Sequence, residues 1–521
     1  MNDMKSVPDL AYYRARTSGR REAVFDYDNK KSYTYAEIEK RANCLAFFLL
    51  EELGLKKGDR IAFCAENSIA FIDAFFMSCK TGIILTSYNY MLGRNELNIL
   101  LEKETPRVVF YSNNCKQAVE NLRQDGIERE YIPINGDLDD RDRYIYSDIT
   151  AYESNGTAVF ETPRFDEIQM LIHTGGTTGE PKAAMMSYWA LFFNAMGEIL
   201  TAGINRYDCV NVMLPFFHTA GWNVLMLPTL IAGGRVIITE KFQPEKILKI
   251  IETERPTACL GIETMYRAIS RHPDFENADF SCYRWMLNGA APISRETLKV
   301  YWNKGVKMVN AYGMTEIGPN NLSPAVNDMT PEEINEKWIS VGRPMYFNNI
   351  RLVNENGVDV HDGERGELLF SGNLTFSGYW MDVEKTNDIV RDGWIHTGDI
   401  AYKDQDGYYY ICGRKKNMFI SGGENIYPIE IEHTIMGHSS IECVCVFGVP
   451  DERWGEVGKA IVVLKPERSV TKEELQAYIG KEKSYIKTPK YIQFIDSIPK
   501  NGVGKVDLVQ VSQIYGYPAD A

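Results

Sequence analysis

The sequence lacks the features that mark several broad classes of protein. Its basic residues are outnumbered, 57 against 71 acidic ones, which gives a formal net charge of −14. An acidic chain is a poor match for a polyanion, so nucleic acid is not expected as a partner. The most apolar stretches are interrupted by Asp73 and Lys80, or by Pro228 and the Gly233–Gly234 pair. Neither provides the ~20 uninterrupted apolar residues of a membrane-spanning helix, so no integral membrane segment is expected.

Patterned cysteines and histidines are missing too. The 10 cysteines include no CxxC pair and the 7 histidines are dispersed, so neither a disulfide framework nor a zinc site is visible. The first residues show no basic segment followed by an apolar run, and we read no signal peptide there. Together these features favour a reducing, cytoplasmic environment.

What the sequence does contain is an alternation of short apolar runs with helical patterns. Runs such as QMLIH, GRVIIT and RWMLNG alternate with segments such as PEKILKIIETE, whose apolar residues recur at i, i+3 and i+4. This alternation predicts an α/β protein with largely parallel sheets. From about Asn348, period-2 alternation broken by Asn-Gly and Asp-Gly turns predicts a small antiparallel unit.

A chain of 521 residues is too long for one core, and its last part reads as a separate domain. GRKKN is a polar break between two apolar strands, so we place the boundary near Lys416. Residues 1–415 are expected to form a large domain of two parallel-type sheets plus a small β-barrel-like unit. Residues 416–521 are expected to form a small α+β domain. Within it, Thr471 and Glu474 form a capping box that predicts the start of a helix.

Four short stretches carry candidate chemistry, and the first is LIHTGGTTGEPKAAMMSY. It reads as a strand, the loop 174–182, a short strand and a helix beginning at Tyr188. A Gly- and Thr-rich loop ending in Lys182 offers backbone N–H groups, hydroxyls and a positive charge to the β- and γ-phosphates of a nucleotide. It is not a Walker loop, because Glu180 and Pro181 precede the lysine. A tight turn between strands is the structural alternative.

The second stretch is NAYGMTEIG, which follows the strand pattern KMV. Glu316 would lie at the carboxyl end of that strand, where ligand sites of α/β sheets gather. Its carboxylate suits the Mg²⁺ that accompanies a triphosphate, although a surface carboxylate is the alternative. NGAAP also ends a strand, and its small residues allow a flat base to lie close to the backbone. Tyr312 is the natural stacking partner for such a base.

The third stretch, GWIHTGDIAYKDQDGYYYICGR, places Asp399 after a Thr-Gly turn. A carboxylate there can accept from both ribose hydroxyls, with Arg414 at the following strand end to assist; an ordinary turn aspartate is the alternative. The fourth, SIPKNGVGKVDL, imitates GxxxxGK but carries Pro499 and Val506 where Gly and Ser or Thr belong. Lys505 therefore reads as a single catalytic lysine on a loop, or simply as an exposed lysine.

In this order, the four stretches resemble the adenylate-forming superfamily, and within it the acyl-CoA synthetase branch of fatty-acid and aryl-CoA ligases. The resemblance extends from KKSYTYAEIEKRANCLAFFL through the Lys505 loop. It implies an enzyme that uses ATP and Mg²⁺ to convert a fatty or aromatic carboxylic acid into acyl-AMP. A mobile C-terminal domain then turns, and the acyl group passes to coenzyme A. The alternative is a stand-alone adenylation enzyme that loads a carrier-protein thiol.

The resemblance also assigns roles to individual residues. The implied ATP-binding residues are Thr174, Gly175, Gly176, Thr177, Thr178, Gly179, Lys182, Gly289, Ala290, Ala291, Asn310, Ala311, Tyr312, Gly313, Met314, Thr315, Asp399, Arg414 and Lys505. The catalytic residues are Lys505, Lys182 and Glu316, and the Mg²⁺ contacts are Thr174 and Glu316. The acyl pocket is assigned to His218, Trp222 and Gly313, the hinge to Lys416, and the coenzyme A tunnel to Ser421, Gly422 and Gly423.

Three positions depart from the family's pattern, and two other functions and the oligomeric state also have to be considered. Ala183 replaces a glycine, Asn417 replaces an aspartate, and Glu263 stands where proline is common. Glu263 could alter the acyl pocket, so the sequence does not identify the carboxylic acid that the enzyme activates. A luciferase-like oxygenase is disfavoured because no Ser-Lys-Leu address is present. A nucleotide-binding regulator without catalysis would not need Lys505. A homodimer remains open.

Overall fold

The computed structural model describes residues 6–126, 129–136, 138, 141–174, 182–500 and 506–518. The backbone divides into two compact units. The first comprises Met1–Pro292, Val300–Asn349 and Phe370–Ile395, and the second comprises Ile293–Lys299, Ile350–Leu369 and His396–Ala521. None of the helices in the described part of the chain is long and apolar enough to cross a membrane.

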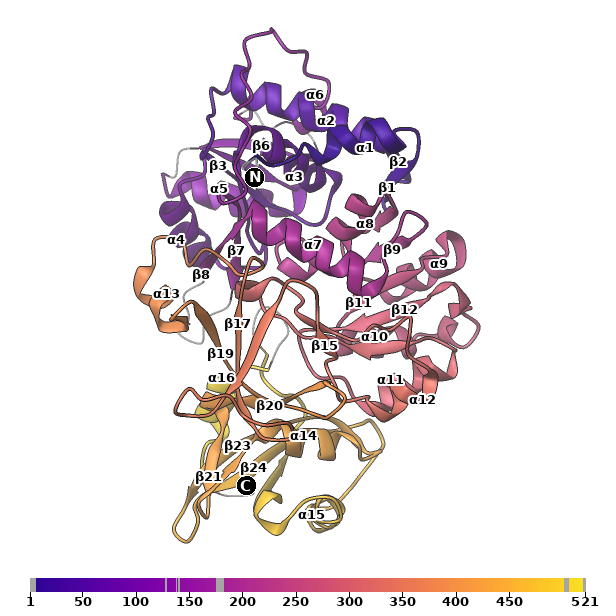
Figure 1. Cartoon of the computed structure of the whole chain (residues 1–521), viewed down its shortest axis with the longest axis vertical. Helices are drawn as coiled ribbons and strands as arrows, with labels where there is room; N and C mark the ends of the chain where they lie inside the picture. The colour runs from indigo at the N-terminus through magenta and orange to yellow at the C-terminus, as the bar shows by residue number, and fades with distance from the viewer. Residues whose placement is uncertain are drawn as a thin grey trace. The chain divides into compact units, whose positions relative to one another are not determined.

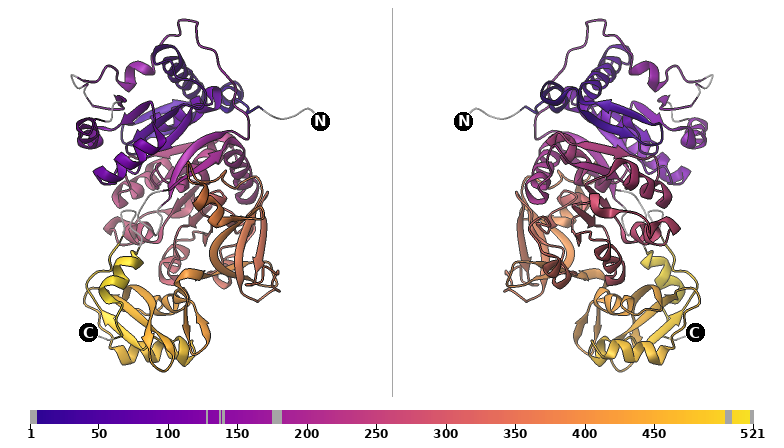
Figure 2. Two further views of the ribbon diagram at one scale, coloured as in Figure 1. Left: turned by 90° about the vertical axis from the view of Figure 1, so that its left-hand side faces the viewer. Right: turned by 90° about the vertical axis from the view of Figure 1, so that its right-hand side faces the viewer.

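One sheet of the first unit has six strands, and four of them, β3, β6, β7 and β8, are labelled in Figure 1. Their order is β6 (Glu130–Pro133), β5 (Val108–Tyr111), β3 (Arg60–Cys64), β4 (Ile84–Ser87), β7 (Ile168–Thr174) and β8 (Lys182–Ser187). All neighbours are parallel except β7 and β8. The connecting helices α3 (Ile69–Thr81), α4 (Arg94–Glu104) and α5 (Lys116–Gln124) flank the strands (Figure 2). Burial on both faces explains why these strands are continuous apolar runs.

The other large sheet of this unit has seven strands. Their order is β13 (Met308–Asn310), β12 (Trp285–Asn288), β11 (Ala258–Gly261), β9 (Cys209–Val212), β10 (Arg235–Ile238), β1 (Glu22–Asp26) and β2 (Lys31–Thr34). Only the β1–β2 pair is antiparallel. Its helices are α1 (Leu10–Ser18), α2 (Tyr35–Phe47), α7 (Tyr188–Ala202), α8 (Met226–Ala232), α9 (Pro244–Glu254) and α10 (Glu263–Ser270). The predicted α/β class with parallel-type sheets is confirmed.

Two further sheets have most of their residues in the second unit. In the first, β16 (Asn349–Val353), β17 (Gly366–Ser371) and β19 (Trp394–Lys403) follow one another, and β20 (Tyr409–Arg414) pairs with β19. The other has the order β22 (Glu424–Ile426), β21 (Phe419–Ser421), β24 (Gly455–Leu464) and β23 (Ile441–Asp451), with β25 (Tyr491–Phe494) on β24. This second sheet and its helices form the separate C-terminal domain that the sequence predicts.

The helices of this domain cover both faces of its sheet. Helices α14 (Pro428–Met436) and α15 (Lys472–Gly480) share one apolar cluster with the strands, while α16 (Leu508–Tyr515) belongs to another. The predicted capping box is present, because Glu474 N–H donates to the Thr471 hydroxyl and the Glu474 carboxylate accepts from Thr471 N–H. The turn η7 (Lys415–Asn417) joins β20 to β21, so the polar break lies between two strands as predicted. A hinge at Lys416 remains a prediction.

Candidate active site

The predicted phosphate loop begins and ends on two paired strands. β7 ends at Thr174, β8 begins at Lys182, and the antiparallel register pairs these two residues. The two ends of the loop therefore lie side by side. The predicted phosphate-binding residues between them, Gly175, Gly176, Thr177, Thr178 and Gly179, lie outside the described residues.

A buried carboxylate lies beside the first end of this loop. The Thr174 hydroxyl oxygen is 3.4 Å from Oε1 of Glu316, which belongs to η6 (Thr315–Ile317) and is 6% exposed. Tyr379 donates its phenolic hydrogen to the same Oε1 at 2.6 Å. The ammonium of Lys182 lies 5.1 Å from the centroid of the Tyr379 ring. Four polar groups from distant parts of the chain thus meet at one place.

Backbone hydrogen bonds hold Tyr379 in this position. Trp380 N–H donates to the Ala183 carbonyl at 2.8 Å, and Met185 N–H donates to the Gly378 carbonyl at 2.9 Å. Gly378 has a φ of +112°, a left-handed conformation that favours glycine. These bonds attach the segment to β8, directly after the loop lysine. The sequence reasoning missed Tyr379, and its only local signal is the Ser-Gly-Tyr-Trp turn.

The protonation state of Tyr379 suits its role as a donor. Burial raises the pKa of this phenol far above its usual range, and the charge of Glu316 raises it further. The phenol therefore keeps its proton and orients the carboxylate. A carboxylate and a hydroxyl oxygen are ligands that Mg²⁺ accepts, and neighbouring ligands of an octahedral ion lie about 3 Å apart. The 3.4 Å separation of Thr174 and Glu316 is compatible with a shared ion.

The predicted base-binding segment follows two parallel strands. Asn288 and Asn310 end β12 and β13 as register partners, and Asn288 Nδ2 donates to Asn310 Oδ1 at 3.0 Å. It also donates to the Ala291 carbonyl at 2.8 Å, which fixes the turn between Gly289 and Ala291. The Ala290 φ of +63° is unusual for a residue with a Cβ. This turn presents small side chains, as the sequence predicts for a flat ligand.

The segment that follows β13 leads into η6. It contains the predicted residues Asn310, Ala311, Tyr312, Gly313, Met314 and Thr315. Tyr312 exchanges backbone hydrogen bonds with Leu322, at 2.9 and 3.0 Å. A Cβ built on Gly313 would lie 2.2 Å from the Pro319 carbonyl oxygen, so only glycine fits there. Glu316 is therefore held by a tightly folded turn rather than by a free loop.

The predicted acyl-pocket residues differ in their surroundings. His218 is half-buried, and its Nδ1 accepts from Ala220 N–H at 3.2 Å, which places the proton of the neutral ring on Nε2. Trp222 is only 1% exposed and stacks on Phe216, with ring centroids 4.9 Å apart. Its indole N–H donates to the Phe216 carbonyl. Trp222 thus belongs to an aromatic cluster, and its place in an acyl pocket stays a prediction.

The second unit contains the predicted ribose residues. Asp399 and Arg414 are register partners on β19 and β20, and Arg414 Nε lies 2.9 Å from Asp399 Oδ1. Asp399 N–H donates to the Thr397 hydroxyl at 3.0 Å. The aspartate side chain is 7% exposed and the arginine 48%, so a buried carboxylate lies beside a partly exposed cation. Lys416 lies in η7, and Lys505 lies outside the described residues.

The three residues predicted for the coenzyme A tunnel form a hairpin. Ser421 ends β21, and Gly422 and Gly423 turn the chain into β22 with φ values of +57° and +85°. A Cβ on Gly422 would lie 2.6 Å from a ring carbon of Trp454, and Gly422 N–H donates to the Trp454 carbonyl at 2.9 Å. Bare backbone at this turn therefore lies directly against an indole.

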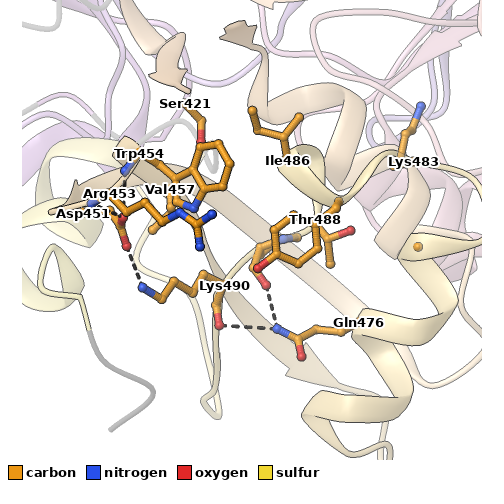
Figure 3. Close-up of a pocket in the computed structure, with 13 residues that line it drawn as sticks. Ser421, Asp451, Arg453, Trp454, Val457, Gln476, Lys483, Ile486, Thr488 and Lys490 are labelled. Carbon is orange, nitrogen blue, oxygen red and sulfur yellow. Dashed lines mark hydrogen bonds and ion pairs between the residues drawn. The ribbon is translucent and has the colours of Figure 1, made fainter. Parts of the chain in front are cut away.

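A cavity of about 620 Å³ opens beside this hairpin (Figure 3). Ser421, Trp454, Arg453, Lys483, Tyr485 and Lys490 are among its lining residues. The Arg453 guanidinium lies 4.9 Å from the Trp454 ring centroid. Lys490 is held by an ion pair of 2.6 Å with Asp451. The cavity thus combines cationic groups with aromatic surface, which suits a ligand bearing both phosphate and a flat ring.

Comparison with known proteins agrees with these features. The model of the AMP-binding enzyme family matches residues 12–380, and that of the AMP-binding enzyme C-terminal domain matches residues 430–505. The chain belongs to the AMP-binding enzyme family. Within this family it lies in the acyl-CoA synthetase branch of adenylate-forming enzymes, as the ordered motifs predict.

Relatives and solved structures cover nearly the whole chain. A feruloyl-CoA synthase from Amycolatopsis sp is 35% identical over 507 residues, 96% of this chain and 98% of the relative. The long-chain-fatty-acid–CoA ligase FadD13 from Mycobacterium tuberculosis is 30% identical over 510 residues, 96% and 97% of the two chains. ATP-bound MatB from Rhodopseudomonas palustris superposes with a TM-score of 0.85 at 27% identity, covering 98% and 99%. These proteins are similar to this chain over nearly its whole length, and the roles of individual residues remain predictions.

Proposed function

We propose that this chain is an AMP-forming ligase that activates a fatty or aromatic carboxylic acid with ATP and transfers the acyl group to coenzyme A. The meeting of Thr174, Lys182, Glu316 and Tyr379 at the ends of the glycine-rich loop carries this proposal. Such a set provides a cation for phosphate, hard oxygens for a metal ion and a donor that orients the carboxylate.

In the first half-reaction, a carboxylate oxygen of the acid attacks the α-phosphorus of ATP. An oxygen–phosphorus bond forms, the bond to pyrophosphate breaks, and acyl-AMP results. Lys182 would neutralise charge on the departing pyrophosphate, and the Tyr379 hydroxyl would keep Glu316 in place. Thr174 and Glu316 would hold Mg²⁺, which supplies charge stabilisation at the phosphates when it is bound. Lys505 is proposed to contact the α-phosphate.

In the second half-reaction, a thiol sulfur attacks the acyl carbon, the bond to AMP oxygen breaks, and the thiol proton is released to solvent. The hairpin of Ser421, Gly422 and Gly423 has no side chains beyond Ser421 to obstruct a slender pantetheine arm. Turning of the C-terminal domain about Lys416 is proposed to exchange Lys505 for this hairpin. Water must be kept out meanwhile, because an acyl-adenylate hydrolyses.

The cavity beside the hairpin favours coenzyme A over a carrier-protein thiol. Both thiols end in pantetheine, but coenzyme A adds an adenine ring and several phosphates at its other end. Arg453, Lys483 and Trp454 offer groups that match those additions. A carrier protein would present a helical surface instead, and it remains the alternative acceptor.

A pyrophosphate-release screen over carboxylic acids tests the proposal. Each acid is supplied with ATP and Mg²⁺, first alone, then with coenzyme A, then with a pantetheinylated carrier protein. Release that depends on the acid, with thioester formed on coenzyme A, is the expected result. If the thioester formed only on the carrier protein, the acyl acceptor would be the carrier protein and not coenzyme A. The absence of acid-dependent pyrophosphate release across fatty and aromatic acids would overturn the proposal.

A further inference from the structure

A group of fully buried polar side chains lies within the first unit. Asn194 and Glu198 are on α7, Asn223 is on η3 (Ala220–Val224), and Asn320 follows η6. Each is at most 2% exposed. Asn194 and Glu198 are four residues apart and therefore face the same way from the helix. The rest of α7 is strongly apolar, so these two polar residues stand out on it.

Each residue of the group uses one of its polar atoms to bind a neighbour. Asn320 Nδ2 donates to Glu198 Oε1 at 2.8 Å, and Asn194 Nδ2 donates to the Asn223 carbonyl at 2.8 Å. Asn223 Nδ2 donates to the Thr219 hydroxyl at 3.0 Å. These bonds fix the orientation of the four side chains.

On three of these side chains the other polar atom has no partner in the described part of the chain. Among the described residues, Oδ1 of Asn194, Oδ1 of Asn223 and Oε2 of Glu198 are buried and find no hydrogen-bond partner. Buried polar atoms in folded proteins are nearly always paired, so three unpaired atoms in one connected group call for a ligand or for water. The three atoms are held in fixed positions and can still form hydrogen bonds.

The protonation of Glu198 decides what kind of partner fits. Burial raises the pKa of Glu198 to about 8, while the hydrogen bond from Asn320 lowers it. The carboxyl is therefore protonated at neutral pH, and Oε2 carries the proton because Oε1 accepts from Asn320. The group then offers one donor and two amide acceptors. A hydroxyl group, which donates once and accepts, is complementary to that set.

The group touches both segments to which the acyl and metal sites are assigned. Thr219, which binds Asn223, directly follows His218. A Cβ built on Gly318, two residues after Glu316, would lie 3.4 Å from Asn194 Oδ1. Asn320, which binds Glu198, continues the same turn. The group therefore lies beside both of these segments.

We propose that Asn194, Glu198 and Asn223 bind a hydroxyl group of the acid at a position remote from its carboxylate. This inference rests on the proposed function, and it narrows the substrate class to hydroxylated acids. The hydroxyl can stand on an aromatic ring or on an aliphatic chain, and the recognition chemistry is the same. An enzyme site built to bond a substrate hydroxyl rejects the analogue that lacks it strongly, by factors of about 10⁴ in favourable cases.

The test compares pairs of acids that differ only by the hydroxyl. Cinnamic acid is paired with its 4-hydroxy derivative, and a fatty acid is paired with the ω-hydroxy acid of the same length. The wild-type kcat/KM for pyrophosphate release is measured for each acid. We expect the hydroxylated member to be preferred by about 100-fold or more in at least one pair, and the pair that shows this tells whether the hydroxyl is aromatic or aliphatic.

Variants connect the preference to the group. Asn194→Leu should reduce the ratio of the two kcat/KM values to below about 10-fold, because an acceptor for the hydroxyl is lost. Glu198→Gln should keep most of the ratio, since its amide still donates. Asn211→Leu is the control: Asn211 is also a buried asparagine of this unit, but its Oδ1 accepts from the Tyr283 hydroxyl at 2.9 Å and only its Nδ2 is without a partner among the described residues. It should leave the ratio unchanged. If Asn194→Leu does not fold, Asn194→Ala removes the same acceptor.

The outcomes separate this inference from the proposed function. Acid-dependent turnover of both members of every pair at similar kcat/KM would overturn the inference and leave the ligase function intact, with buried water as the partner of the three atoms. A wild-type preference that Asn194→Leu and Asn211→Leu change equally would also overturn it. Failure of every acid to release pyrophosphate would overturn the ligase function and this inference together.

Discussion

The phenolic oxygen of Tyr379 lies 2.6 Å from a carboxylate oxygen of Glu316, and both residues are buried. The contact joins the turn after β13 to the segment that pairs with β8. It fixes the carboxylate beside Thr174, where the glycine-rich loop begins. The position of Glu316 therefore depends on a residue far along the chain as well as on its own turn.

Removing the Tyr379 hydroxyl should weaken adenylation without unfolding the protein. A hydrogen bond to a charged acceptor contributes about 1.5–3 kcal/mol, so Tyr379→Phe should lower kcat/KM for pyrophosphate release by about 10- to 100-fold. Glu316→Gln should lower it by orders of magnitude and shift the Mg²⁺ dependence. Tyr283→Phe, which removes another buried phenol, is the control. If Tyr379→Phe and Glu316→Gln turned over as fast as the wild type at limiting Mg²⁺, Glu316 would not be the Mg²⁺ ligand that Tyr379 orients.

The Asp399 carboxylate should determine the affinity for ATP. Arg414 and the strand register hold this side chain in place. Asp399→Ala would remove a charge-assisted contact to the ribose hydroxyls and weaken ATP binding by roughly 2–3 kcal/mol. Isothermal titration calorimetry measures this directly. An undiminished ATP affinity in the variant would exclude Asp399 as the ribose ligand.

Features of the site that depend on local sequence patterns were predictable, whereas contacts between residues far apart in the chain were not. The strands, the capping box of Thr471 and Glu474, and the strands at the two ends of the glycine-rich loop follow from local patterns, and the structure contains them. Tyr379 could not be found this way, because it reaches Glu316 through the pairing of Trp380 with Ala183 across the fold. Trp222 was assigned to the acyl pocket from its place in the motif, yet its ring packs inside an aromatic cluster. Asn194 and Glu198 do carry a signal in the sequence, because they are two polar residues at helical spacing in an otherwise apolar helix.

Burial of Glu198 should make stability fall with rising pH. The carboxyl of the unfolded chain ionises near pH 4.5, whereas burial raises the pKa in the folded protein to about 8. Between these values the folded state holds a proton that the unfolded state has lost, so each pH unit favours unfolding by up to about 1.4 kcal/mol. Glu198→Gln should remove that loss, and its stability relative to wild type should rise from pH 5 to pH 8.

Thermal unfolding midpoints at several pH values provide the measurement. Glu252→Gln, at a 70% exposed side chain on α9, is the matched control, and its difference from wild type should vary little with pH. A constant difference between Glu198→Gln and wild type across this range would mean that Glu198 is ionised in the folded protein.

The cationic cavity of the second unit should affect the thiol substrate and not ATP. Arg453→Ala removes the guanidinium that lies over Trp454, and we expect the KM for coenzyme A to rise by about 5-fold, since an exposed phosphate contact contributes up to about 1 kcal/mol. The KM for ATP should stay unchanged. Lys481→Ala removes the same charge from an exposed residue outside the cavity lining and is the control. Equal effects of both variants would show that only net charge matters.

The proposed ligase carries out its two half-reactions with different residues of its C-terminal part, and assays of each half-reaction by itself distinguish the roles of these residues. Lys505→Ala should abolish acyl-adenylate formation but leave thioester formation from supplied acyl-adenylate nearly intact. Lys416→Pro should do the reverse, because a fixed φ and a missing N–H at the proposed pivot would block the domain turn. If Lys505→Ala slowed both halves equally, or Lys416→Pro spared thioester formation, the account would be contradicted.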